Sequence, residues 1–137
     1  MRLRITTPLA RLVDEEVRGL RAEDASGWFG ILPGHADFLT RLAVSVVSWT
    51  HPDGSAMHCA VRGGVLTVSG GREVAIATAE AVADADLLRL DETVLAAFQA
   101  KAEAERVEHS AQAQLQLNAI RQIMKHLRAA QRAGARL

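Results

Sequence analysis

The sequence predicts a segregated α+β fold: an N-terminal antiparallel β-sandwich followed by a C-terminal two-helix hairpin, or by the same helices extended. Nine of the ten glycines and all three prolines lie in residues 1–83. Residues 84–137 hold thirteen alanines and a single glycine. Glycine and proline interrupt regular structure, whereas alanine favours helix. Two domains are therefore expected, a sandwich over residues 1–85 and a helical tail over residues 86–137.

Short runs of alternating polarity predict the strands. The first is expected over Arg2–Thr6, where Leu3 and Ile5 share one face. A longer strand is expected over Arg41–Thr50, with a change of phase at Val46–Val47 that indicates a β-bulge.

Turn residues divide the next runs into hairpins. His51–Gly54 contains Pro-Asp-Gly and precedes a strand over Ala56–Val61. Ser69–Gly71 separates Val65–Val68 from Glu73–Thr78. Short strands at this spacing predict a sandwich or a barrel, and no helix is expected before residue 84.

In the helical tail, Asp84 or Asp86 is expected to cap the first helix. The residues predicted to share one face of that helix are Leu88, Leu95, Phe98 and Ala102. Ser110 either caps a second helix, which gives a hairpin, or lies inside one continuous helix; both remain open. A tail packing stripe with heptad spacing follows, formed by Ala113, Leu117, Ile120, Met124 and Leu127.

Charge in the tail is strongly divided. Residues 84–108 carry seven acids and three bases, net −4, whereas residues 109–137 carry five bases and no acid, net +5. Mixed surfaces are the norm in globular proteins, so a one-sided basic row predicts a docking face for an acidic partner. This basic face consists of Arg121, Lys125, Arg128, Arg132 and Arg136.

Several function classes are excluded by composition and spacing. Formal net charge is zero and aromatic residues make up 4%, so no nucleic-acid partner is expected. No catalytic constellation, cofactor motif or metal-ligand spacing is present, and Cys59 is expected to be a buried strand residue. No apolar run is long enough for a transmembrane helix, and no signal peptide is recognised. A cytosolic, non-catalytic protein is expected.

The most informative segment is Phe29–His35, with the sequence Phe-Gly-Ile-Leu-Pro-Gly-His. Pro33 and Gly34 favour a type II turn, because proline fixes φ and glycine accepts the positive φ that follows. Ile31 and Leu32 are too apolar for an ordinary solvated loop, which predicts a turn packed against another surface.

Together with Thr7-Pro8, Leu39-Thr40, Gly63-Gly64 and the alanine-rich stretch 87–135, this segment resembles the epsilon subunit of the F-type rotary ATP synthase. The order of these features matches the family from end to end. The resemblance implies a non-catalytic part of the central stalk, bound to the cytoplasmic face of an energy-transducing membrane only through the complex.

The resemblance also implies roles for particular residues. The sandwich would bind the gamma subunit and rest its loop end on the ring of c subunits. Gly30, Gly63 and Gly64 would be structural turn residues. The helical tail would inhibit ATP hydrolysis when extended, with the basic face against the catalytic alpha and beta subunits. The loop residues expected to contact the c ring or gamma are Trp28, Phe29, Ile31, Leu32, Pro33, Gly34 and His35.

Three departures from the family pattern are present. Trp28 stands where members often have an acid, and Leu42–Val44 lacks a common glycine. Some bacterial members bind ATP through an Asp-x-x-Arg motif; here Asp91 is present but Val94 replaces the arginine. Loss of that cation removes a phosphate partner, so weak or absent ATP binding is expected.

A second hypothesis is a free-standing interaction module, in which the sandwich and a coiled-coil tail form a homo-oligomer. Sedimentation of the isolated protein distinguishes the two, since a stable oligomer burying the stripe from Leu117 to Leu127 favours the second.

Overall fold

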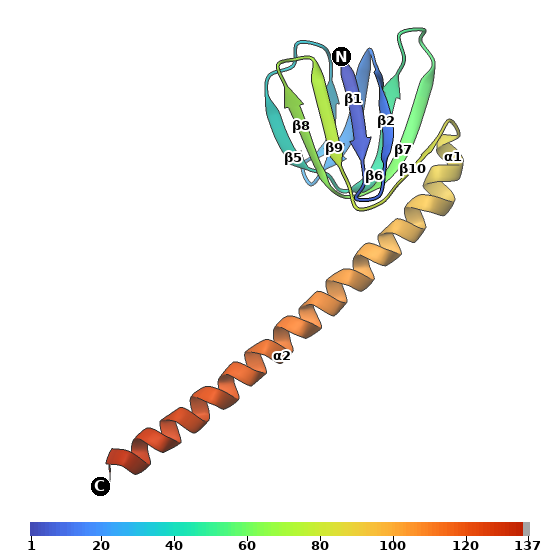
Figure 1. Ribbon diagram of the computed structural model, residues 1–137. Helices are drawn as coiled ribbons and strands as arrows, with labels where there is room; N and C mark the ends of the chain where they lie inside the picture. The colour runs from blue at the N-terminus through green and yellow to red at the C-terminus, as the bar shows by residue number, and fades with distance from the viewer. Residues whose placement is uncertain (136–137) are drawn as a thin grey trace. The chain divides into compact units, whose positions relative to one another are not determined.

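The computed structural model describes residues 1–135 and contains ten strands in two five-stranded sheets (Figure 1). In spatial order, sheet A consists of β2 (Arg11–Glu16), β1 (Arg2–Thr6), β9 (Glu73–Ala77), β8 (Val65–Ser69) and β5 (Phe38–Arg41). Sheet B consists of β10 (Ala81–Asp84), β7 (Ala56–Arg62), β6 (Val44–Thr50), β3 (Gly19–Asp24) and β4 (Gly27–Ile31).

The predicted β-sandwich is confirmed, with one difference in strand direction. β1 pairs with β2 in the antiparallel sense but with β9 in the parallel sense, Leu3 lying opposite Val74. The other pairings are antiparallel, including the two predicted hairpins β6–β7 and β8–β9.

The main core lies between the two sheets. Leu3 and Ile5 are fully buried, as their alternation predicts, and they pack with residues of both sheets such as Trp49 and Ile76. Cys59 is also in this core. Burial raises the pKa of its thiol to about 12, so the thiol stays protonated and inert near neutral pH.

The single strand predicted over Arg41–Thr50 is wrong. The chain leaves β5 at Arg41 and enters β6 at Val44, so this segment joins two different sheets. The predicted bulge is not found in the β6–β7 pairing, whose register runs without a shift, while the β3–β6 pairing stops at Ser48. Val46 and Val47 are both buried for another reason: Val47 faces the inter-sheet core, whereas Val46 faces a second cluster on the outer side of sheet B.

That second cluster is formed by the start of the helical tail. Leu90 and Phe98 pack on Val46 and Ala60, and partly buried apolar neighbours complete the contact. Lys101 Nζ lies 3.0 Å from a carboxylate oxygen of Glu80 at the edge of the same region. Burying apolar surface stabilises this arrangement by roughly 25 cal/mol per Å².

The helical tail is one continuous helix, so the two-helix hairpin is not what the structure shows. It comprises α1 (Leu87–Arg89), the π-helical segment η1 (Leu90–Val94) and α2 (Leu95–Ala135), with Ser110 inside α2. Asp86 is the N-cap, as predicted, and its carboxylate accepts hydrogen bonds from the amides of Leu88 and Arg89.

The π-helical turn changes which residues face the sheet. In η1 the amide of Leu95 donates to the carbonyl of Leu90, five residues back, which shifts the phase of the helix. Leu90 is consequently fully buried while Leu88, predicted for the packed face, is 66% exposed.

The chain divides into two compact units that meet within the long helix. Strand β10 ends at Asp84 and α1 begins at Leu87, close to the predicted division at residues 85–86. The first unit nevertheless extends from Met1 to Ala102, because the first turns of the helix pack on sheet B, and the second begins at Glu103.

Candidate functional site

The segment Leu32–Asp37 connects the free edge of sheet B, strand β4, to the free edge of sheet A, strand β5. Its turn has the predicted form. The carbonyl of Leu32 accepts a hydrogen bond from the amide of His35 at 3.1 Å, and Gly34 has φ of 88°. Pro33 and Gly34 are therefore the two central turn residues.

Two hydrogen bonds hold this loop to the turn between β8 and β9. The amide of Gly34 donates to the carbonyl of Gly71 at 2.8 Å. The Asp37 carboxylate accepts from the amide of Gly70, also at 2.8 Å. The loop is thus fixed at Gly34 and at Asp37 and presents a defined surface.

Aromatic packing supports the inner side of the loop. The rings of Phe29 and Phe38 meet edge to face with centroids 5.7 Å apart, and the ring of His35 lies 5.8 Å from Phe38. His35 Nδ1 is 2.7 Å from the carbonyl oxygen of Ala36. Ile31 is fully buried in the core, so its predicted role as a contact residue is corrected to one of anchoring the loop.

The outward side of β4 carries an exposed apolar surface, which we call the β4 outer face and define as Trp28, Gly30 and Leu32. Trp28 is 55% exposed and Leu32 67%. The guanidinium of Arg21 lies 4.8 Å from the centroid of the Trp28 ring, a cation–π contact. A shallow hollow lies at Gly30, beside the Trp28 ring.

Gly30 was predicted to be a turn residue, and this prediction is wrong. It lies inside β4 opposite Arg21, and an added Cβ would meet nothing closer than 3.8 Å. Its effect is to leave the hollow open. Gly63 and Gly64 lie between β7 and β8 with φ of 71° and 113°, and a Cβ on Gly64 would lie 2.1 Å from the carbonyl oxygen of Ala77.

Leu39 is an exposed residue that was not among the predicted contacts. It is 69% exposed on β5, whose inward residue Phe38 packs against the core. Leu39 therefore lies on the outer side of sheet A, away from the β4 outer face on sheet B. The alternation of Phe38 and Leu39 could have revealed it.

The predicted tail stripe is solvent-exposed within the second unit. Leu117, Ile120, Met124 and Leu127 are each between 49% and 60% exposed, and Ala113 is exposed too. No described residue covers them.

Four members of the predicted basic face, Arg121, Lys125, Arg128 and Arg132, line one shallow hollow with Met124 and Ala129. Arg136 lies outside the described residues. The tail packing stripe and the basic face therefore place apolar and positive surface on adjacent sides of α2.

The two positions compared with the ATP-binding motif in the sequence, Asp91 and Val94, lie in η1. Asp91 is exposed, whereas Val94 is partly buried against the cluster of Leu90 and Phe98. Val94 thus has a packing role.

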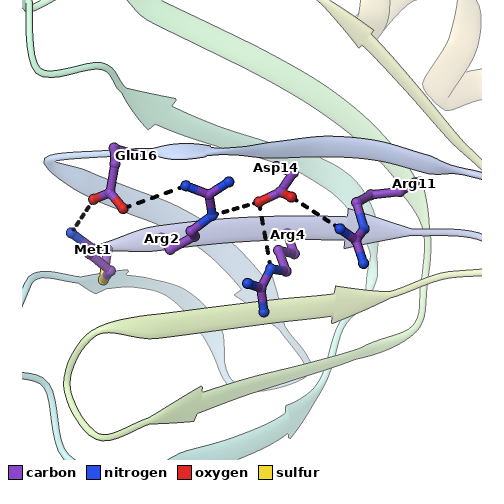
Figure 2. A network of polar contacts seen from close by, with 6 residues as sticks. All are labelled: Met1, Arg2, Arg4, Arg11, Asp14 and Glu16. Atoms are coloured by element: carbon purple, nitrogen blue, oxygen red, sulfur yellow. Dashed lines mark hydrogen bonds and ion pairs between the residues drawn. The ribbon is translucent and has the colours of Figure 1, made fainter.

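A network of ion pairs lies on β1 and β2, at one edge of sheet A (Figure 2). Asp14 is its centre: it accepts from Arg2 Nε at 2.7 Å and from Arg11 Nη1 at 3.1 Å, and Arg4 Nε is 3.5 Å away. The hydrogen bond from Arg2 holds the pKa of the Asp14 carboxyl below its usual value. Glu16 extends the network to Arg2 and the amino group of Met1.

Among residues 1–135, no group of three or more His, Cys, Asp or Glu side chains is placed to hold a metal ion. No helix in that part of the chain is both long and apolar enough to cross a membrane.

Comparison with known proteins gives a consistent result. Residues 1–84 match the family model for the ATP synthase delta/epsilon chain, beta-sandwich domain. An ATP synthase epsilon chain 2 of Cereibacter sphaeroides is 47% identical over 126 residues, covering 91% of this chain and 86% of the relative. An ATP synthase epsilon chain 2 of Paraburkholderia xenovorans is 40% identical over 129 residues, covering 93% of each.

Two solved structures share the fold. A chain of the mitochondrial ATP synthase of Euglena gracilis has a TM-score of 0.57 at 26% identity, covering 59% of this chain and 51% of that one. A chain from the central stalk and c ring of the Tetrahymena thermophila mitochondrial ATP synthase has a TM-score of 0.53 at 15% identity, covering 82% and 94%.

Proposed function

The chain belongs to the ATP synthase delta/epsilon family as a non-catalytic epsilon subunit, and from that premise we propose that its sandwich couples the gamma subunit to the ring of c subunits. The β4 outer face and the adjoining loop rest on the ring, and the sandwich binds gamma. The subunit then lies at the cytoplasmic face of an energy-transducing membrane, held there by the complex.

The observation that carries this proposal is the combination of exposure and rigidity in one segment. Trp28 and Leu32 expose large apolar side chains, while the Gly34–Gly71 hydrogen bond and the Phe29–Phe38 contact fix the backbone beneath them. Exposed apolar side chains on a fixed scaffold are typical of interaction sites. A rotor component needs such a surface, because torque is transmitted only through contacts that do not yield.

For the helical tail we propose a regulatory role, in which the basic face binds acidic surfaces of the catalytic subunits and slows ATP hydrolysis. Support comes from four cations along one side of α2 with an uncovered apolar row beside them. Charge pairing acts within about 8 Å at physiological salt, so it contributes only when the tail lies against its partner.

The structure indicates where the chain should be cut to test this regulatory role. A cut after Asp86 would remove Leu90 and Phe98 and uncover the outer side of sheet B. A chain ending at Ala102 keeps that packing and removes only the second unit. The full-length chain and the chain ending at Ala102 should be captured equally by immobilised gamma. The complex that contains the chain ending at Ala102 should hydrolyse ATP faster than the complex with the full-length chain.

Unchanged hydrolysis with normal gamma capture would contradict the inhibitory role while leaving the coupling role intact. Failure of the full-length chain to bind gamma would contradict the coupling role itself.

A further inference from the structure

The guanidinium of Arg21 is an exposed cation that the fold holds beside the β4 outer face. Arg21 lies on β3 between the buried residues Leu20 and Ala22, so its side chain points to the outer side of sheet B. It is paired with Gly30 of β4, and its guanidinium lies 4.8 Å from the centroid of the Trp28 ring. The apolar side chains of the β4 outer face therefore have a positive charge next to them.

Stacking on Trp28 positions this guanidinium without using its hydrogen bonds. A cation–π contact engages the flat face of the group, whereas its five N–H donors lie in its plane. Within residues 1–135, the side chain of Arg21 makes no hydrogen bond or ion pair with another residue. By contrast, Arg2 and Arg11 on sheet A both donate to Asp14. Arg21 thus presents a positioned set of donors that the subunit itself does not use.

Two shallow hollows adjoin Arg21 and make its donors accessible to a partner. One is the hollow at Gly30 beside the Trp28 ring. The other lies on the opposite side of β3 and is lined by Ser48 and Thr50 of β6. Because neighbouring strands are about 4.8 Å apart, β4 and β6 are separated by roughly 10 Å. A protruding loop has room there to place one side chain against Arg21 and its neighbours in the hollows.

Glu23 is an acid on the same side of β3, and its position shows which charge a partner meets. It is paired with Trp28 in the β3–β4 register but makes no ion pair with Arg21. Glu23 is half-buried, whereas Arg21 is exposed. The accessible charge is therefore the cation, and charge complementarity favours a partner that presents a carboxylate.

We propose that Arg21 and Trp28 form a carboxylate-binding clamp, and that the partner seated on the β4 outer face presents an acidic side chain to it. This inference rests on the contact with the c ring proposed above, so the acidic side chain belongs to the loop of the ring that meets this face. Its carboxylate accepts two parallel hydrogen bonds from the guanidinium, the common geometry of arginine–carboxylate pairs. Its carbon stem lies against the indole. Tryptophan and arginine are the side chains most enriched at the energetic centres of interfaces.

Capture of the purified c ring by the full-length chain, assembled with gamma, tests the clamp. Arg21→Gln removes the charge at an exposed position and should weaken capture about fivefold. Glu23→Gln is the matched control on the same strand, and it should leave capture unchanged or strengthen it. A ring whose exposed carboxylates have been amidated should bind the wild-type chain as weakly as the native ring binds Arg21→Gln. Amidation should cause no further loss with Arg21→Gln.

Leu32→Ser in the same assay separates the clamp from the coupling role. If Leu32→Ser weakens capture and Arg21→Gln does not, the ring contacts the β4 outer face but the clamp is overturned. A loss with Glu23→Gln would overturn it too, because the partner would then present a base. If neither Leu32→Ser nor Arg21→Gln changes capture, the contact of this face with the ring is itself contradicted. Binding to vesicles of anionic lipid that Arg21→Gln abolishes, with ring capture unchanged, would assign Arg21 to a membrane surface and overturn the clamp.

Discussion

Gly34 and Gly71 lie in direct backbone contact, the amide of Gly34 donating to the carbonyl of Gly71 at 2.8 Å. Gly34 is the tip of the loop between the sheets, and Gly71 belongs to the β8–β9 turn. A Cβ on Gly71 would lie 2.9 Å from the Cα of Gly34. The position of the loop therefore depends on the absence of one side chain in a different hairpin.

We predict that Gly71→Ala destabilises the sandwich and displaces the loop. Gly70→Ala is the matched control, because Gly70 also has a positive φ but an added Cβ there would meet nothing within 4 Å. The control should cost about 1–2 kcal/mol for the left-handed conformation, and Gly71→Ala roughly 1–3 kcal/mol more for the clash. Equal losses in urea unfolding would show that the contact with Gly34 is unimportant.

We predict that Phe98→Ala releases the start of the helix from sheet B. Phe98 is 3% exposed in the cluster with Val46, Ala60 and Leu90, and truncating a buried phenylalanine typically costs about 3–5 kcal/mol. Amide hydrogen exchange over residues 95–102 should accelerate accordingly. The exposed neighbour Gln99, changed to Ala, serves as control. Similar exchange in both variants would refute the packing role.

We predict that the ion pairs of Asp14 stabilise the fold at neutral pH but not in strong acid. Arg2 lowers the pKa of the Asp14 carboxyl from its ordinary value of 3.8. A carboxyl with a lowered folded-state pKa contributes stability above its unfolded value, and that contribution is lost as pH falls through the folded value. Asp14→Asn should therefore be less stable than wild type at pH 7, with the difference vanishing in strong acid.

Urea unfolding at several pH values checks the Asp14 prediction. Glu92→Gln, on the exposed side of η1, is the control and should show little difference from wild type at any pH. A wild-type advantage over Asp14→Asn that stays constant from neutral pH into strong acid would argue against the ion pairs as its source.

ATP is expected to bind weakly or not at all. By the resemblance described above, Val94 stands where some bacterial members have an arginine. It packs against the Leu90–Phe98 cluster and offers no charge to a phosphate. Calorimetric titration of the full chain with Mg-ATP should give no saturable heat in the micromolar range. A saturating isotherm there would mean that other residues have taken over the arginine's role.

The sequence predicted the sandwich because its hairpins carry strong turn residues, such as those at His51–Gly54 and Ser69–Gly71. Five strands, β2, β3, β4, β5 and β10, were not predicted, and for β2 and β4 the physical reason is visible. β2 contains three consecutive acids, which mask its alternation although Val13 is buried. β4 contains two glycines, which in the sequence resemble a loop.

In the candidate site, too, the sequence alone did not predict which of two neighbouring residues is exposed. Ile31 and Leu32 are adjacent, yet Ile31 is fully buried and Leu32 is 67% exposed. Once Gly27–Ile31 is known to be a strand, alternation separates the two side chains. The phase of the first helix could not be read in this way, because the π-helical turn at Leu90–Val94 breaks the regular 3.6-residue period.

The proposed contact with the c ring is tested most directly by comparing two leucines of nearly equal exposure, Leu32 at 67% and Leu39 at 69%, which lie on the outer sides of different sheets. Leu32→Ser and Leu39→Ser are each assembled with gamma, and capture of the purified c ring is measured. We predict that Leu32→Ser weakens capture about tenfold, as expected for loss of an interface anchor, whereas Leu39→Ser leaves it unchanged. Equal capture by both variants, or a larger loss with Leu39→Ser, would contradict the account.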